Sequence, residues 1–361
     1  MKHSLFYLVL VLLISACNSE PSTQALNDSS TTMAVEQSWQ SIQPGGDTVC
    51  SDGSPYSFHV KPGEQDKLFI FLNGGGACFS SQTCDDRQGD NIFVQRADLP
   101  HNDPNMHQGV FDLDNPNNPL ADWSMVFVSY CTGDVHLGTL NQNYVADDGY
   151  EFSTRHQGAA NARSALNWVK ENLSPAKIMV AGASAGALAS PVYAGEVANI
   201  FPEADVIQYA GGGAGYRSQA IPSVMAHVGV ADALPTGLYP NIDLSQALFY
   251  DFYSMQQNEN TSRIRFSLYD TDDDQVQKSF RRLLGDSGLL SDDLRRTYSD
   301  LDGNNIQVSH FLADGDTHTI LRFDKFYQEQ VGETSFITWF NELLEGEKPS
   351  HVDCLNSDDG C

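Results

Sequence analysis

The sequence predicts an α/β fold in which a mostly parallel sheet is flanked by helices, with cap-like insertions between them. Three observations predict this class. Short apolar runs with the length of buried strands alternate with helical patterns along the chain. Glycine-rich or acidic loops follow several of these runs, as at the ligand-binding edge of an open parallel sheet. One run leads directly into a Gly-x-Ser-x-Gly turn and a helical pattern rich in small residues.

The N-terminal segment predicts export. Its charged start, its apolar run over residues 5–14 and the small residues that follow are typical of a signal peptide over residues 1–16. Ile14-Ser15-Ala16-Cys17 resembles a bacterial lipobox, so we expect lipidation of Cys17, with an ordinary secretory signal as the alternative. Asn18 is not the aspartate that retains lipoproteins in the inner membrane, which favours an outer-membrane lipid anchor.

The rest of the chain predicts a tether, one large domain and a tail. Residues 17–38 are polar and aperiodic, which is typical of a flexible tether. Residues 39–350 carry the strand and helix patterns without an internal repeat, so we expect a single α/β domain there and a tail over residues 351–361. The formal charge of −27, from 47 acidic and 20 basic residues, argues against a nucleic-acid partner.

Six cysteines remain after Cys17, and an even number in an exported chain predicts disulfides whose connectivity the sequence does not define. Cys78–Cys84 and Cys354–Cys361 are plausible local pairs, which would leave Cys50–Cys131. None of these cysteines has the spacing of a zinc site, so we expect no metal and no cofactor.

The expected elements begin with a strand over residues 67–72, an apolar run that ends in the tight loop Asn73-Gly74-Gly75-Gly76. Residues 80–122 are polar and rich in Asp, Asn and Pro, and an insertion of this length is commonly a substrate-facing cap or lid. Further strands are expected at residues 125–130, 177–183, 205–210, 263–269 and 306–312, and helices at residues 156–173 and 336–343.

Gly182-Ala183-Ser184-Ala185-Gly186 predicts a catalytic nucleophile. A serine at the tip of a sharp strand-to-helix turn is the nucleophile elbow of α/β-hydrolases, in which glycines let the helix pack close behind the strand. The alternative is a glycine-rich turn that carries a serine by chance. The glycine loop after residue 73 and a well-placed histidine favour the hydrolase, with Ser184 as its nucleophile.

A hydrolase of this type carries its triad in the order Ser, Asp or Glu, His. His318 follows the last expected strand by a short loop, which is where the base is expected. The other histidines after the serine fit less well, because His227 precedes the acid candidates, His310 lies within the strand and His351 lies in the tail.

The acid is one of four aspartates that follow the penultimate strand, and only one of them can brace the imidazole. They are Asp270, Asp272, Asp273 and Asp274.

An oxyanion hole needs backbone amides directed at the developing negative oxygen. Ala185, just after the nucleophile, would supply one amide, and residues 74–77 would supply others, as in the glycine loop of lipases. No Lys-Ser or Lys-Thr follows these glycines, which excludes a P-loop.

Several stretches together resemble the pectin acetylesterase/Notum family over roughly residues 40–345. They are Phe71-Leu72-Asn73-Gly74-Gly75-Gly76-Ala77-Cys78-Phe79, Tyr130-Cys131-Thr132-Gly133-Asp134-Val135-His136-Leu137-Gly138 and the elbow itself. Cys50-Ser51-Asp52-Gly53-Ser54-Pro55 resembles the opening segment of that family, and Asn117-Asn118-Pro119-Leu120-Ala121-Asp122-Trp123 resembles its bacterial branch.

The resemblance implies an α/β-hydrolase fold, a serine nucleophile and hydrolysis of carboxylic esters without a metal. It places the base at His318 and the oxyanion amides at Gly75, Gly76 and Ala185.

The family carries its acid in an Asp-x-x-Gln pattern, and two placements of this pattern fit the chain. Asp274-Gln275-Val276-Gln277 matches better than Asp272-Asp273-Asp274-Gln275, because an apolar residue precedes the glutamine. The resemblance therefore favours Asp274, then Asp272 and then Asp270.

The sequence as a whole predicts a lipid-anchored serine carboxylesterase that hydrolyses short-chain acyl esters, above all acetyl esters, on a polysaccharide such as pectin or on a small molecule. Because pectin is a polyanion and this chain is strongly acidic, a neutral ester has equal weight. One alternative is a lipase-like enzyme or polyester depolymerase acting on longer acyl esters. The other is a non-catalytic surface lipoprotein that binds glycan or protein.

Overall fold

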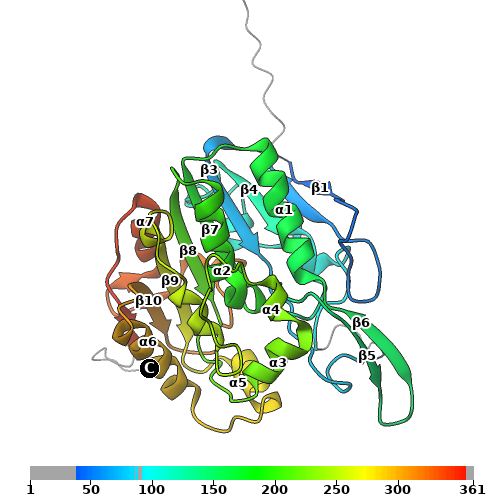
Figure 1. Cartoon of the computed structure of the whole chain (residues 1–361). Coiled ribbons are helices and arrows are strands. Elements are labelled where there is room, and N and C mark those ends of the chain that lie inside the picture. Colours follow the sequence, from blue (N-terminus) through cyan, green and yellow to red (C-terminus); the bar gives the residue numbers. More distant parts are fainter. Residues whose placement is uncertain (1–37, 86, 88–91, 355–361) are drawn as a thin grey trace, which may run out of the picture. The chain divides into compact units, whose positions relative to one another are not determined.

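The computed structural model describes residues 38–85, 87 and 92–354, and a sheet of nine strands forms its centre (Figure 1). The strand order is β1-β2-β4-β3-β7-β8-β9-β10-β13. Strands β1, β2 and β4 pair antiparallel at one edge, and all other neighbours in the sheet pair parallel. The expected α/β-hydrolase-type sheet flanked by helices is thereby confirmed.

The nine strands of this sheet are β1 Gln40–Ile42, β2 Phe58–Lys61, β3 Glu64–Leu72, β4 Trp123–Val128, β7 Lys177–Ala183, β8 Asp205–Gly211, β9 Arg265–Thr271, β10 Val308–Ala313 and β13 Val352–Asp353. Two short antiparallel pairs lie outside it: β5 Asn141–Val145 with β6 Glu151–Arg155, and β11 Gln330–Val331 with β12 Thr334–Ser335.

The α-helices are α1 Gly158–Asn172, α2 Ala185–Ile200, α3 Ile221–Val228, α4 Val230–Ala233, α5 Gln275–Leu283, α6 Leu290–Gly303 and α7 Phe336–Glu345. Short 3₁₀ turns are η2 Pro100–Asn102, η3 Pro104–Met106, η4 Gly109–Phe111, η5 Phe249–Ser254, η6 Thr261–Arg263 and η7 Asp324–Tyr327.

The sheet is covered on both faces, because its central strands are buried at successive positions rather than at alternate ones. In β3, Leu68 and Ile70 point into a core formed with α1, α2, α3 and α6, whereas Phe69 and Phe71 point into a second core formed with α7 and η4. Figure 1 shows α1 and α2 in front of the sheet and α7 at the left, on the side of β9 and β10.

All six strands and both helices expected from the sequence are present. The β5–β6 hairpin was not expected, because its residues are mostly polar and lack the apolar alternation of a half-buried strand. Part of the segment 80–122, expected as a substrate-facing cap, buries Val110, Phe111 and Leu120 in the second core, against β3 and β4.

Two disulfides are complete within the described residues, Cys50–Cys131 and Cys78–Cys84. Cys354 is disulfide-bonded as well, and its expected partner Cys361 lies outside the described residues. Such bonds persist in oxidising compartments, in agreement with export. The signal peptide and Cys17 also lie outside the described part, and within that part no helix has the length and apolar character of a membrane span.

Candidate active site

Ser184 lies at the sharp turn between β7 and α2, and its backbone is strained. Its φ of 54° and ψ of −117° are unusual for a residue with a side chain. The turn is tight because a Cβ on Gly182 would lie 2.1 Å from Gly186 O, and a Cβ on Gly186 would lie 2.0 Å from Leu72 O. The Ser184 hydroxyl makes no capping hydrogen bond to α2, so the turn directs it away from the helix that it begins.

Asp274 and His318 form a short hydrogen bond. Asp274 is fully buried at the N-cap of α5, where Oδ1 accepts from the amides of Val276 and Gln277, both at 2.9 Å. Its Oδ2 accepts from Gln277 Nε2 at 3.0 Å and lies 2.6 Å from His318 Nδ1. Because the carboxylate accepts, Nδ1 carries the proton and Nε2 is the lone-pair nitrogen. His318 Nε2 is buried and has no hydrogen-bond partner among the described residues.

The loop after β8 connects the imidazole with the elbow. The His318 ring packs against Gly212, where a Cβ would lie 3.1 Å from both Nδ1 and Cε1. The preceding residue, Gly211, accepts a hydrogen bond from the Ser184 amide at 2.8 Å. Ser184 and His318 therefore contact two consecutive residues, Gly211 at the end of β8 and Gly212 just after it.

The other three aspartates have different surroundings. Asp272 accepts from the Gly315 amide at 3.0 Å, and Asp273 is exposed and pairs with Lys278. Within the described residues, Asp274 is the one of the four that contacts His318. The geometry agrees with the preference for Asp274, and its catalytic role stays a prediction.

Asp270, near the end of β9, is a second fully buried carboxyl group. It accepts hydrogen bonds from the amides of Gly213 and Ala214, from Gln277 Nε2 and from the Tyr298 hydroxyl, at 2.9 to 3.2 Å. Burial raises the pKa of Asp270 to about 7 in spite of these donors. Gln277 thus donates to both buried carboxyl groups, a role that the sequence pattern did not reveal.

The glycine loop after β3 contacts the elbow. A Cβ on Gly74 would lie 2.8 Å from Ser184 Cβ, so only glycine allows the two segments to approach this closely. Gly76 has a φ of 79°, and a Cβ there would lie 1.9 Å from Ile92 O. Ala185, the first residue of α2, has an amide without an acceptor within the helix. The structure therefore brings the predicted oxyanion residues next to Ser184.

The remaining candidate histidines lie in other surroundings. His227 Nε2 is 2.6 Å from the Tyr144 hydroxyl, and the His310 ring stacks between Tyr298 and His351 at centroid distances of 4.2 and 4.3 Å. His310 lies on β10 as expected.

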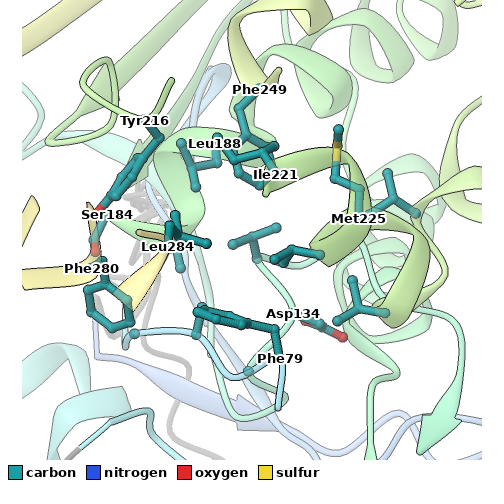
Figure 2. Close-up of a pocket in the computed structure, with 18 residues that line it drawn as sticks. Phe79, Asp134, Ser184, Leu188, Tyr216, Ile221, Met225, Phe249, Phe280 and Leu284 are labelled. Atoms are coloured by element: carbon teal, nitrogen blue, oxygen red, sulfur yellow. The ribbon is translucent and has the colours of Figure 1, made fainter. Parts of the chain in front are cut away.

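An apolar pocket opens at Ser184 (Figure 2). It encloses about 610 Å³ of empty space, including its open mouth. Figure 2 shows Ser184 beside Tyr216 and Phe280, with Met225 on the opposite side of the pocket. Most of the other lining side chains are aliphatic or aromatic, and they come from α3, the start of α2 and the loops after β3 and β4. The apolar spacing of Ile221, Met225 and Val228 on α3 is the sequence signal that could have indicated this wall.

The closest group of metal-ligand atoms in the described part is Cys78, Cys84 and His156, within 4.8 Å of one another. Its two sulfur atoms are joined in a disulfide, so they cannot act as thiolate ligands.

Comparison of the sequence with known proteins identifies the family of the chain. Residues 31–220 match the sequence model of Pectinacetylesterase, which is more than half of the chain. The chain belongs to the pectinacetylesterase family. The matched range contains the glycine loop and Ser184 and ends before Asp274 and His318.

Similar curated proteins include the palmitoleoyl-protein carboxylesterases notum2 of Xenopus laevis and NOTUM of Mus musculus. The chain is 31% identical to the first over 144 residues and 29% identical to the second over 161 residues, which are 38% and 43% of its own length. These alignments span 28% and 30% of the two relatives, less than a third of either. The chain is also 29% identical over 124 residues to the inactive palmitoleoyl-protein carboxylesterase notum1b of Danio rerio, covering 33% of this chain and 81% of that protein. Because one relative is named inactive, an activity has to be argued from the site itself.

Proposed function

We propose that the protein is a serine carboxylesterase in which Ser184, His318 and Asp274 form the catalytic triad. The observation that carries this proposal is the 2.6 Å contact of His318 Nδ1 with Asp274, which leaves Nε2 as a buried proton acceptor without a partner among the described residues. The strained elbow supports it, because Ser184 lines the apolar pocket and its hydroxyl does not cap α2.

In the proposed reaction, Ser184 Oγ attacks the ester carbonyl carbon while its proton passes to His318 Nε2. The carbonyl oxygen becomes an oxyanion that accepts hydrogen bonds from the amides of Gly75, Gly76 and Ala185. The proton then passes to the leaving alcohol, and a water molecule activated by the same nitrogen releases the acid. Asp274 keeps the proton on Nδ1 and stabilises the imidazolium that forms.

A Ser184→Ala variant tests the mechanism. Hydrolysis of p-nitrophenyl butyrate should fall by at least about 10⁴-fold, because the nucleophile is removed. Ser164→Ala is the control, since the Ser164 hydroxyl donates to the Asn161 carbonyl of its own helix, away from the site. Turnover by a folded Ser184→Ala variant at the wild-type rate would overturn the mechanism. A wild-type protein that no fluorophosphonate probe labels would favour the non-catalytic scaffold.

For the acyl group, the pocket favours a chain longer than acetyl. Its wall is almost entirely apolar, and an apolar wall favours a hydrocarbon chain over a polar group. The relatives are named for removing palmitoleoyl, a long acyl group, from protein. The acetyl ester of a polysaccharide stays a prediction that this pocket does not specifically support.

A series of p-nitrophenyl esters from acetyl to dodecanoyl separates the two substrates. If the acyl chain enters the pocket, kcat/KM should rise about fourfold per methylene until the pocket is full, because each buried methylene contributes about 0.8 kcal/mol. A maximum at acetyl, together with acetate release from acetylated pectin or xylan, would favour the polysaccharide.

For the location, we propose lipidation at Cys17, on the sequence pattern alone. A Cys17→Ser variant should leave the membrane fraction and become soluble, and a variant that stays in the membrane fraction would exclude this anchor.

A further inference from the structure

Three successive carbonyl groups of the glycine loop are held by separate donors. His136 Nε2 lies 2.8 Å from the Asn73 carbonyl oxygen, and His101 Nε2 lies 3.0 Å from that of Gly74. The Gly75 carbonyl accepts from the Val94 amide at 2.8 Å. A carbonyl oxygen only accepts, so both histidines carry a proton on Nε2.

These contacts determine where the loop amides point. In a planar trans peptide, the N–H of one residue points opposite to the C=O of the residue before it. Anchoring the Gly74 carbonyl on His101 therefore directs the Gly75 amide away from His101, and anchoring the Gly75 carbonyl does the same for Gly76. The Gly74 amide is occupied, because it donates to Asn73 Oδ1 at 3.0 Å.

Arg322 lies beneath the same loop as a buried charge. It is 9% exposed, and its Nη1 donates to Asn73 Oδ1 at 2.8 Å. No ion pair between Arg322 and a carboxylate is found in the described residues, and its Nε there has no partner. Burial lowers the pKa of Arg322 to about 10, so the group is still charged at neutral pH. A buried, unpaired cation is costly, so its retention calls for a function.

We propose that His101 and Arg322 are positioning residues of the oxyanion hole. His101 directs the Gly75 amide by holding the Gly74 carbonyl. Arg322 fixes the side chain of Asn73 and places a positive charge beside the loop, where negative charge develops on the ester oxygen. This inference rests on the proposed esterase function.

The proximity of the two residues adds a constraint. Arg322 Nη1 lies 3.4 Å from His101 Nε2, and both atoms are donors, so this approach is not a hydrogen bond. The Gly74 carbonyl therefore remains the acceptor for the proton on His101 Nε2.

The test for His101 compares a variant that keeps the donor with one that removes it. His101→Gln retains an N–H group near the position of Nε2, whereas His101→Met removes it at similar volume. With p-nitrophenyl butyrate, kcat of His101→Met should fall at least about tenfold with little change in KM, and His101→Gln should recover most of the loss. The same substitutions at His310, half-buried on β10, are the controls and should leave kcat unchanged.

The second readout is the affinity for a trifluoromethyl ketone, which forms an oxyanion on the nucleophile. Its Kd should rise in proportion to the loss of kcat/KM in His101→Met, because only oxyanion binding is impaired. A purely structural role would lower the thermal stability without this correlation.

For Arg322, the pair Arg322→Lys and Arg322→Met separates the charge from the side-chain shape. Arg322→Met should lose more kcat than Arg322→Lys, with KM nearly unchanged in both. This pair also carries the test if His101→Met does not fold.

The outcomes separate this inference from the proposed function. If Ser184→Ala abolishes turnover while folded His101→Met or Arg322→Met keeps the wild-type kcat, the positioning role is wrong and the esterase stands. If Ser184→Ala turns over normally, the esterase itself fails. A loss confined to KM, with unchanged affinity for the ketone, would likewise overturn the inference.

Discussion

The two polar networks that flank Ser184 carry opposite charge. The network around α5 holds two fully buried carboxyl groups, Asp270 and Asp274, and among the described residues no lysine or arginine donates to either of them. The network next to the glycine loop holds a buried guanidinium, that of Arg322. No carboxylate among the described residues pairs with it. Ester hydrolysis places positive charge on the imidazole and negative charge on the substrate oxygen. The negative network lies beside the imidazole and stabilises its positive charge. The positive network lies beside the glycine loop and stabilises the negative charge of the oxyanion.

The largest effect is expected from removing the charge beside the imidazole. Asp274→Asn should lower kcat by about 10³- to 10⁴-fold, because the amide stabilises the wrong tautomer of His318 and cannot balance its positive charge. The matched control is Asp273→Asn, one residue away, exposed and in contact with Lys278. If kcat of a folded Asp274→Asn variant stayed within a few-fold of wild type, the negative network would have no role in catalysis.

A smaller effect is expected from the bridge between the two carboxyl groups. Gln277→Leu removes one donor from Asp274 and one from Asp270, while Asp274 keeps two backbone amides and His318. We expect kcat to fall about tenfold, since each lost hydrogen bond to a charged group is worth about 1.5–3 kcal/mol and only part of it affects the transition state. Gln275→Leu, at an exposed position of the same helix, should be neutral, and an equal loss in both variants would argue against a specific bridge.

The smallest effect on catalysis, and a distinct one on stability, is expected at Asp270. Its pKa is raised from 3.8 to about 7, so the folded state favours the protonated form, and this contribution to stability is lost as pH rises through about 7. Asp270→Asn mimics the protonated group, because its oxygen can accept the same donors and its amide can donate to Tyr298. The variant should therefore lose less stability than wild type between pH 4 and pH 8, by a few kcal/mol at about 1.4 kcal/mol per pKa unit.

Urea unfolding at a series of pH values measures this difference. Parallel stability curves for wild type and Asp270→Asn would show that Asp270 is ionised throughout, and both networks would then be charged over the whole pH range.

The sequence could predict the parts of the site that are contiguous along the chain. The elbow at Ser184 has a strong signal, because a strand, a strained turn and a close-packed helix must follow one another within a few residues. His318 could be predicted from its position after the last strand. Among the four aspartates, the choice depended on a family resemblance, because a single-residue shift changes which carboxyl group faces the imidazole.

The supporting residues had no such signal. His101 lies in the polar segment 80–122, which was interpreted as a cap, and its contact with Gly74 joins residues 27 positions apart. Arg322 meets Asn73 across 249 positions. No local pattern identifies a lone histidine or arginine as the anchor of a distant loop, since only the tertiary fold brings them together.

The N-cap position of Asp274 couples the proposed triad to one wall of the pocket in this chain. Asp274 begins α5, and Phe280 of the same helix lines the pocket. A mutation that shifts α5 to reshape the pocket therefore also moves the carboxylate that orients His318. The α3 wall, with Ile221 and Met225, carries none of the proposed catalytic residues. We therefore expect substitutions in α3 to change the acyl-chain preference with a smaller loss of kcat than substitutions in α5.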